Sequence, residues 1–500
     1  MALSKASLAL VLALFSAKSL QAPTQSTVNA CNAISKAIPG KLFSPGSSGY
    51  KEENEDYWNA GLSDLKPACI LKPTTPQEVG KAFQVLGEFT DVNFSVKSGG
   101  HDPNPGHSSS QDGVLIALSK IKGTTYDKAT NLAQVKPGGQ WADVVGPLEK
   151  FGVTAVGGRL DVVGIGGYLA GGGLSFLSAQ YGMAADSIVG WELVTANGSV
   201  INVDAKTQPD LAVALRGGGN QYGVTTKFSI EAHPIGKVWG GIRIYAGWAE
   251  QEVFAALHDF IGNNNKDPKA AVIVNSNKLV SGVAIYMIFF FYDAPEAPKG
   301  AFGKFEDISD LLDMTGTYTY PELLTKNSMG ADSLSNRASF RSITLPRIPS
   351  RPQFYREIEA QWETIFKDYA QSHPGSIVVI AFQPFPAILA KNSASRGSNS
   401  MGLTANDKDR FVLEITGQWS SADDDNTIWD LSKQLTDWIE EQIPQVTTPE
   451  SEQYLPLFMN DAAFSQDVFG SYKDVEKFRA LQKEMDPTGF FSKRAGGFNV

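Results

Sequence analysis

The chain has 500 residues, about three times the length of a typical domain, so the sequence predicts two or three domains or one large two-part enzyme. Hydrophobic residues make up 42% and charged residues only 19%, which excludes a disordered or coiled-coil chain. The formal net charge is −10, and no run of lysine or arginine interrupts it. Nucleic acid is therefore not an expected partner, because binding to phosphates needs a basic face.

The first 22 residues are predicted to be a secretory signal peptide. Lys5 gives the positive start, a mostly apolar run extends over residues 6–17, and small and polar residues follow up to Ala22. The run is too short to cross a bilayer as a helix, so no membrane segment is expected after cleavage. A buried N-terminal helix is the alternative. We expect the mature protein to be secreted or to reside in the lumen of the secretory pathway.

An oxidising compartment makes a disulfide the expected state of the two cysteines, Cys31 and Cys69. Two sequons for N-linked glycans, at Asn93 and Asn197, fit the same compartment, and Asn197 followed by glycine is also typical of a tight hairpin turn. Two cysteines are too few for a zinc ribbon or an iron–sulfur cluster, and the five histidines lack metal-binding spacing. No metal site is expected.

Strands and helices mix along the chain without a strict β–α–β alternation, which predicts an α+β fold. The apolar patterns predict a helix after residue 76, extended segments at 92–97, 114–118 and 133–136, a helix around 141–148, a hairpin at 191–203 and a buried strand at 283–292. Nearer the C-terminus they predict a strand at 412–419, a helix that opens at residues 423–425 and a last helix that carries Val475 and Met485 and stops at Asp486-Pro487.

Eight glycines lie within the seventeen residues from Gly157 to Gly173, and aliphatic residues stand between them. Such a run lets the backbone approach a ligand closely, whereas a flexible linker would carry serine or glutamine at those places. Leu169 stands where a G-x-G-x-x-G motif needs its last glycine, and the lysine of a phosphate-binding P-loop is missing. The absence of a G-x-S-x-G elbow argues against a serine hydrolase.

Five motifs, each weak alone, occur in a set order and spacing. They are Lys97-Ser-Gly-Gly-His101 with Gly106, the run from Val163 to Gly173, Tyr181-Gly182 with Asp186, Arg216-Gly-Gly-Gly-Asn220 with Tyr222-Gly-Val224, and a terminal block from Asn460 to Phe490. Together they resemble the FAD-linked oxidoreductases of the vanillyl-alcohol oxidase superfamily, and most of all its berberine bridge enzyme-like branch in its secreted fungal form. The resemblance covers nearly the whole mature chain.

The resemblance implies a bipartite fold. An FAD-binding domain of the PCMH type would comprise residues 28–235 and the returning segment 455–500, and an α+β substrate domain would be inserted as residues 236–454. The FAD-binding residues that it implies are Lys97, Ser98, Gly99, Gly100, His101, Gly106, Val163, Gly164, Gly166, Gly167, Gly171, Gly172, Gly173, Tyr181, Gly182, Asp186, Val224 and Asn460.

The same resemblance implies a covalent bond between His101 and the flavin. Many relatives carry a second bond, to a cysteine, but this chain has Leu160 at that position, so the attachment is expected to be monocovalent. Val163 would lie beside the flavin at the oxygen-access position, where a small branched residue goes with oxidase behaviour.

The strand at 412–419 carries the expected catalytic base. Alternation along a strand places Val412, Glu414, Thr416 and Gln418 on one face. The resemblance gives Glu414 the role of base, because burial beside an apolar ring would raise the pKa of a carboxyl group. A glutamate on a solvated sheet face is the alternative.

Two further residues are expected near the reacting atoms. Tyr168 replaces a histidine of many relatives, and Asn460 is retained and would contact the flavin ring. Residues 458–461 depart from the Tyr-x-Asn-Tyr pattern of the sugar-oxidising relatives, so a carbohydrate oxidase is the less favoured alternative.

The function expected from these observations is that of a secreted FAD-dependent oxidase in secondary metabolism. A small organic metabolite would give a hydride to flavin N5, and dioxygen would reoxidise the flavin and yield hydrogen peroxide. We expect the protein to be a monomer. The alternative from another class is a protein of the same fold without net redox turnover, either a cyclase or a binding protein.

Overall fold

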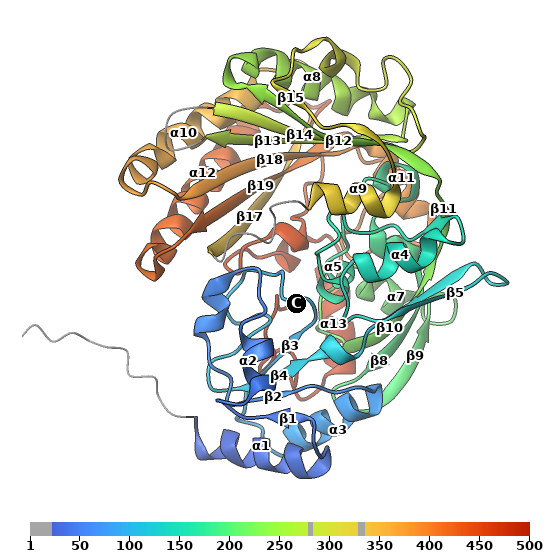
Figure 1. Ribbon diagram of the computed structural model, residues 1–500, viewed down its shortest axis with the longest axis vertical. Coiled ribbons are helices and arrows are strands. Elements are labelled where there is room, and N and C mark those ends of the chain that lie inside the picture. The colour runs from blue at the N-terminus through green and yellow to red at the C-terminus, as the bar shows by residue number, and fades with distance from the viewer. Residues whose placement is uncertain (1–22, 279–283, 329–335) are drawn as a thin grey trace, which may run out of the picture.

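The structure is a computed structural model that describes residues 23–278, 284–328 and 336–500. The predicted signal peptide, residues 1–22, lies outside these ranges. Helices combine with sheets of four, five, two and eight strands, which confirms the α+β class (Figure 1). In the described ranges no helix is both long and apolar enough to cross a membrane.

The N-terminal sheet has the strand order β1-β2-β4-β3, in which β4 pairs in parallel with both β2 and β3. Its strands are β1 (Leu42–Phe43), β2 (Cys69–Leu71), β3 (Phe94–Lys97) and β4 (Val114–Ala117), and the helices beside it are α1 (Gln25–Ala37), α2 (Ser48–Asn54) and α3 (Pro76–Gly87). The predicted helix after residue 76 is α3: the Thr75 side chain accepts a hydrogen bond from the Glu78 N–H, and proline occupies the first turn.

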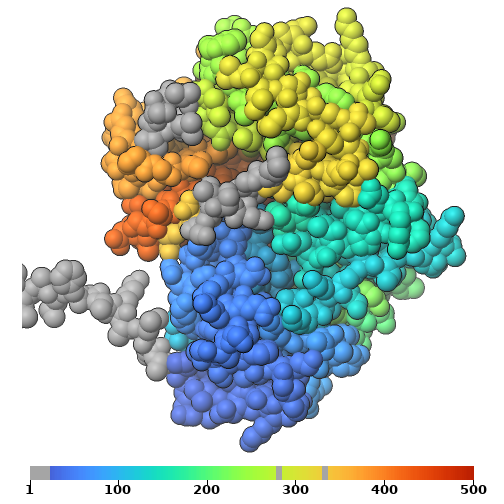
Figure 2. Space-filling view, viewed as in Figure 1, coloured from blue at the N-terminus to red at the C-terminus, as the bar shows by residue number. Residues whose placement is uncertain are grey.

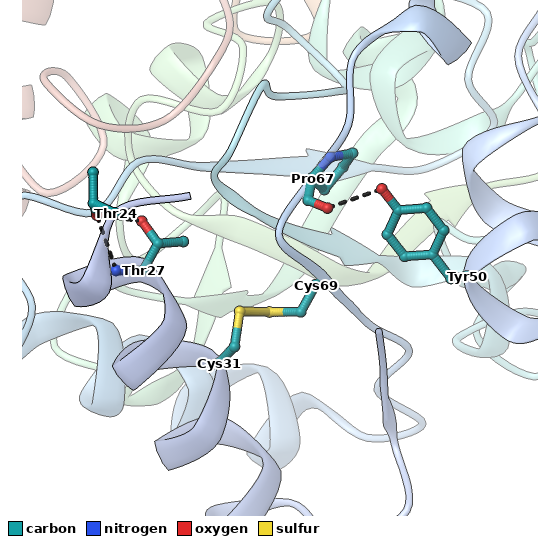
Figure 3. The surroundings of a disulfide bond; sticks show 6 residues. All are labelled: Thr24, Thr27, Cys31, Tyr50, Pro67 and Cys69. Atoms are coloured by element: carbon teal, nitrogen blue, oxygen red, sulfur yellow. Dashed lines mark hydrogen bonds between the residues drawn. A yellow bond between two sulfur atoms is a disulfide. The ribbon is translucent and has the colours of Figure 1, made fainter. Parts of the chain in front are cut away.

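The predicted disulfide is present. Cys31 in α1 is bonded to Cys69 in β2, with their Cα atoms 6.1 Å apart (Figure 3). Close to it, the Tyr50 hydroxyl donates to the Pro67 carbonyl at 2.9 Å and fixes the segment that leads into β2 (Figure 3). The bond therefore ties the first helix to an inner strand of the N-terminal sheet.

The second sheet is antiparallel and has the order β5-β6-β10-β8-β9. Its strands are β5 (Thr124–Asp127), β6 (Leu132–Val135), β8 (Ile188–Val194), β9 (Val200–Asp204) and β10 (Val224–Glu231). The β8–β9 hairpin turns at Asn197-Gly198, as predicted, with Gly198 at φ +81°. A Cβ on Gly80 of α3 would lie 2.2 Å from the Gly198 carbonyl, so helix and turn are in direct backbone contact.

The third large sheet contains eight antiparallel strands in the order β15-β12-β14-β13-β18-β19-β17, with β16 also paired to β12. The strands are β12 (Lys237–Ala246), β13 (Ala270–Lys278), β14 (Ala284–Tyr292), β15 (Leu312–Asp313), β16 (Gly316–Thr319), β17 (Arg337–Pro346), β18 (Ile377–Phe385) and β19 (Arg410–Trp419). One face is covered by α8 (Glu250–Asn263), α10 (Phe354–Ser372) and α12 (Asp425–Val446) (Figure 1).

The two faces of the eight-stranded sheet differ in character, and β19 shows how. Leu413 and Ile415 are fully buried in the apolar core beneath the covering helices. Glu414 and Thr416 alternate with them, are half-buried and point the other way, towards the rest of the molecule. At β19 the sheet therefore presents polar side chains to the N-terminal part, which lies below the later half of the chain in Figure 2.

The chain returns to its beginning after α12. The short helix η8 (Met459–Asp461) and α13 (Val475–Met485) follow, and α13 ends where predicted. The Asp486 carboxylate accepts the N–H groups of Phe490 and Phe491 at 2.6 and 2.8 Å. Phe94 in β3 forms a parallel bridge with Ala495, so the C-terminus completes the N-terminal sheet and ends near the centre of the molecule (Figure 1).

The remaining elements connect these layers. They are β7 (Val153–Thr154), β11 (His233–Pro234), α4 (Ala142–Glu149), α5 (Ile165–Ala170), α6 (Ser178–Tyr181), α7 (Pro209–Leu215), α9 (Tyr320–Asn327) and α11 (Ala387–Ser395). The chain leaves the five-stranded sheet after residue 231 and enters the eight-stranded sheet at residue 237.

Candidate active site

A cavity of about 350 Å³ lies where the N-terminal part, the polar face of the eight-stranded sheet and the returning C-terminal segment meet. This volume falls within the usual range for small-molecule and cofactor sites, about 300–1,000 Å³. The residues expected from sequence that line it are Ser98, Gly99, Gly100, His101, Val163, Gly164, Gly166, Gly167, Tyr168, Gly171, Val224, Glu414 and Asn460. Those that do not line it are Lys97, Gly106, Gly172, Gly173, Tyr181, Gly182 and Asp186.

Two glycine-containing segments cross at the cavity wall. A Cβ on Gly99 would lie 2.4 Å from the Gly164 Cα, and a Cβ on Gly164 would lie 2.6 Å from the Gly99 Cα. The Ser98 hydroxyl accepts the Gly166 N–H at 3.0 Å and donates to the Pro137 carbonyl. Only glycine permits this contact, and the contact brings the His101 loop against the start of α5.

His101 is half-buried in an aromatic setting. Its ring stacks on Trp58 with centroids 4.8 Å apart, and Trp58 stacks in turn on Phe340 of β17 at 4.8 Å. The backbone N–H of Trp58 donates to the Gly100 carbonyl at 3.1 Å and holds the loop in place. Burial lowers the pKa of His101 to about 4, partly offset by the charge of Asp102, so the imidazole is neutral at neutral pH.

Lys97 supports this loop from behind. Its ammonium is almost fully buried, donates to the Glu53 carbonyl at 2.8 Å and lies 4.4 Å from the centre of the Tyr57 ring. Gly100 has φ +67°, and a Cβ there would lie 2.8 Å from the Asp56 carbonyl oxygen. The segment 53–58 therefore fixes the path of the chain into His101.

Asn460 pins the second half of the glycine run. Its side-chain oxygen accepts the Gly173 N–H at 3.0 Å, and its amide donates to the Tyr168 carbonyl at 3.1 Å. The Tyr168 hydroxyl donates to the Leu174 carbonyl at 2.6 Å, and burial raises the pKa of this phenol. Both residues line the cavity while they shape the loop.

Tyr181, Gly182 and Asp186 lie behind the glycine run and connect it to the segment 393–399. The buried Asp186 carboxylate accepts the Met183 N–H at 2.7 Å, the Asn399 amide at 2.8 Å and the Ser393 hydroxyl. Burial raises the pKa of Asp186. Tyr181 stacks on His233 with centroids 3.8 Å apart, which places it away from the cavity.

A polar network faces the cavity from the eight-stranded sheet. The Gln383 oxygen of β18 accepts from the Arg159 guanidinium at 2.6 Å. The Gln383 nitrogen donates to Glu414 at 3.0 Å and to Asp461 of η8 at 2.8 Å. The Thr416 hydroxyl donates to the other oxygen of Glu414 at 2.6 Å. Burial raises the pKa of Asp461 well above its usual range, and the Glu414 charge raises it further.

Sequence reasoning did not assign several residues that line the cavity. They include Arg159, Phe340, Asp461, the C-terminal Gly496 to Phe498, and the pair Asp102 and His107, whose side chains lie 2.8 Å apart. The C-terminal residues have a weak sequence signal, since Gly496 lets the tail pass close to the backbone of residues 106–107 and Gly497 lies against the Asn220 side chain. No spacing rule joins the others. Within the described ranges, no group of three metal-binding side chains occurs.

The chain is similar to known flavoproteins over most of its length. Residues 67–204 match the FAD binding domain family. An FAD-linked oxidoreductase of Arthroderma benhamiae is 32% identical over 472 residues, which is 91% of this chain and 92% of the relative. An FAD-dependent monooxygenase of Emericella nidulans is 29% identical over 94% of this chain and 98% of its own length.

Solved structures share the fold. The 6-hydroxy-D-nicotine oxidase of Arthrobacter nicotinovorans superposes with a TM-score of 0.71 at 20% identity and covers 91% of this chain and 96% of its own. Berberine bridge enzyme from Eschscholzia californica gives 0.72 at 16% identity and covers 93% and 98%. The chain therefore belongs to the FAD-linked oxidoreductases, and it shares its fold with berberine bridge enzyme.

Proposed function

We propose that the protein is a secreted FAD-dependent oxidase of a small organic hydroxyl compound and that its FAD is attached covalently through His101 alone. The observation that carries the proposal is the crossing of Gly99 and Gly164 beside His101, at the wall of a cavity of cofactor size. A Cβ at either glycine would break this backbone contact. The two glycines therefore allow the two segments to lie in direct contact next to the imidazole.

The residues present fit the flavin. His101 is neutral because of burial, and a neutral imidazole nitrogen has the lone pair that a covalent bond requires. Leu160 lines the cavity with an aliphatic side chain that cannot form a second link. Bound FAD would supply a two-electron acceptor for a hydride. Ser98, the glycine run and the C-terminal residues 496–498 would hold it, and Asn460 would fix the loop that shapes its site.

Glu414 is the base in this proposal. It projects into the cavity from β19, is held by the Thr416 hydroxyl and the Gln383 amide, and would take the proton that a substrate hydroxyl loses as its carbon loses a hydride. Phe340, Phe458 and Leu160 line the same cavity and give it apolar walls that exclude water. Phe458 offers no hydroxyl group, which speaks against a sugar as the substrate.

Export from the cell is part of the proposal. The Cys31–Cys69 bond supports it, because disulfides persist in oxidising compartments. Asn93 and Asn197 are both exposed and are the proposed sites of N-linked glycans. Mass measurement of protein from a eukaryotic host, with and without glycosidase, tests both sites, and unmodified asparagines would count against export.

Oxidase turnover is tested by mixing the protein anaerobically with candidate alcohols and phenols and recording flavin bleaching. The proposal predicts complete bleaching by a true substrate and one hydrogen peroxide per flavin on re-aeration. Since several relatives are named FAD-dependent monooxygenases, a second candidate is the insertion of one oxygen atom into the substrate. Bleaching by a reduced nicotinamide as the external hydride donor, but by none of the alcohols and phenols, would favour that candidate and contradict the oxidase; absence of bleaching by every compound, the reduced nicotinamide included, would contradict both.

A further inference from the structure

The amide of Gln383 has only one orientation that satisfies its neighbours. A guanidinium can only donate, so Arg159 must face the amide oxygen, and the NH₂ group must face the carboxyl groups of Glu414 and Asp461. Each N–H then serves one carboxyl oxygen. The two acids are thereby held on a single nitrogen atom, at 3.0 and 2.8 Å.

The fold brings these groups together from three separate parts of the chain. Ala381 of β18 pairs with Glu414 of β19, so Gln383, two residues further along β18, is a diagonal neighbour of Glu414 on the same face. Asp461 arrives from η8 in the C-terminal segment. Gln383 is 2% exposed and Asp461 is 7% exposed, while Glu414 opens into the cavity.

The surroundings of Asp461 disfavour two negative charges. The titratable groups that face it are Glu414, Arg159 and the hydroxyl of Tyr168. Burial raises the pKa of Asp461 most, the Glu414 charge and the hydrogen bond between the two carboxyl groups raise it further, and Arg159 and Gln383 lower it. One proton on the pair leaves a single negative charge opposite Arg159, so the group as a whole is neutral.

We propose that Glu414 and Asp461 act as a carboxyl pair that holds one proton, with Glu414 as the base and Asp461 as the acid that keeps the pair singly charged. The catalytic part of this proposal rests on the proposed oxidase function. The pair accepts a neutral substrate with a hydroxyl group and rejects a free carboxylate, because a second anion beside Glu414 would have no positive partner left.

The step balances in atoms and charge. The Glu414 carboxylate would accept the substrate O–H proton, and bound FAD would supply the acceptor for the C–H hydrogen and its electron pair, so that the alcohol becomes a carbonyl compound. The pair then holds two protons, and one returns to solvent when the product leaves. At neutral pH a doubly ionised pair would already have taken up one proton from water. Asp461 carries that proton, so Glu414 remains a carboxylate that can accept the proton of the substrate.

The pair is tested first without substrate, by infrared difference spectroscopy of the holoenzyme over pH. At pH 7 the wild type should show a carboxylic acid C=O band that Asp461→Asn lacks. The matched control, Asp467→Asn, changes an exposed residue of the same segment and should keep the band. Burial also raises the pKa of Asp186, and any carboxylic acid band from Asp186 is common to all three proteins and cancels in the differences. Identical wild-type and Asp461→Asn spectra would overturn the proposal.

Glu414→Gln provides a second test that does not depend on the folding of the Asp461 variant. Removal of the neighbouring charge should lower the pKa of Asp461, so the band should persist but titrate at least about one pH unit lower than in the wild type. An unchanged midpoint would show that the two carboxyl groups do not interact and would overturn the pair.

Kinetics separate the pair from the oxidase proposal. In the wild type, the rate of anaerobic flavin reduction should fall at low pH, where the pair holds two protons, and at high pH, where ionised Asp461 places a second negative charge beside the substrate. Asp461→Asn should keep the acid limb and lose the alkaline limb. Retention of the alkaline limb would refute the role of Asp461. If no compound reduces the flavin, the oxidase function fails, and the infrared result decides the pair alone.

Discussion

Val163 lies on the cavity wall, and its backbone carbonyl accepts the Trp141 N–H at 3.0 Å, so its position is fixed. In the proposed oxidase, a leucine at this position would fill space beside the flavin ring that dioxygen needs.

We predict that Val163→Leu slows flavin reoxidation by dioxygen. The flavin is reduced photochemically, so that no substrate is needed, and is mixed with oxygenated buffer in a stopped-flow instrument. The matched control is Val153→Leu in β7, which makes the same exchange outside the cavity and should reoxidise at the wild-type rate. Equal rates for wild type and Val163→Leu would remove the support that Val163 gives to the oxidase assignment.

Glu414→Gln is expected to slow anaerobic flavin reduction by a substrate by roughly 10²–10⁴-fold, the usual effect of a lost general base. Glutamine keeps the size of the side chain and can still accept from Thr416, so the fold should be unchanged. The control, Glu192→Gln in β8, removes a half-buried glutamate that contacts Lys227 at 3.5 Å and should leave the rate unaffected. Reduction of Glu414→Gln at the wild-type rate would exclude Glu414 as the base.

Single residues were predictable where a local pattern fixes them. Alternation in the strand at 412–419 is enough to place Glu414 and Thr416 on the polar face, opposite Leu413 and Ile415. The network around Gln383 was not predictable, because Arg159 and Asp461 are 224 and 78 positions away from it in sequence. Such contacts depend on which strands pair over long distances in sequence, and a short stretch of sequence does not contain that information.

At the scale of elements, the crossing of the His101 loop and the glycine run is the feature that shapes the cavity. Gly99→Ala would place a methyl group 2.4 Å from the Gly164 Cα, and overpacking of this kind costs about 1–3 kcal/mol of unfolding free energy. We predict lower stability and loss of flavin from this variant. Urea unfolding and flavin content per protein measure the two effects.

The control is Gly87→Ala in α3, where a Cβ would meet nothing within 4 Å, φ is not positive and no proline follows. This exchange should stabilise the helix by about 0.5–1 kcal/mol, since alanine is the better helix former. A Gly99→Ala protein as stable and as yellow as the wild type would show that the crossing does not require glycine.

Helices and strands with a clear local pattern of apolar residues agree with their predictions. Strands that exist only because they pair with a neighbouring strand could not be predicted from the sequence. The last helix, Val475–Met485, carries the predicted apolar residues and ends where predicted, because Asp486-Pro487 follows it. The two-residue strands β1, β7, β11 and β15 have no periodicity of their own. They are strands only because a neighbouring strand supplies their hydrogen bonds.

For the whole molecule, the Cys31–Cys69 bond closes a loop with a sequence separation of 38. In the chain-entropy model, a loop of this size stabilises the folded state by about 4 kcal/mol. We predict that the double variant Cys31→Ser, Cys69→Ser loses stability of this order in urea unfolding. Treatment with a thiol reductant should destabilise the wild type to the same extent and leave the double variant unchanged. Equal stability of wild type and double variant would contradict this role of the bond.

The central claim is that this chain holds FAD in its cavity by one covalent bond to His101. The most direct measurement is acid precipitation of the purified protein, followed by proteolysis and mass spectrometry of the yellow peptide. We predict that all flavin stays with the protein, that the flavin-bearing peptide contains His101, and that His101→Ala releases its flavin while His373→Ala keeps it. Flavin that leaves the wild-type protein on precipitation, or that is found on a peptide without His101, would contradict the account.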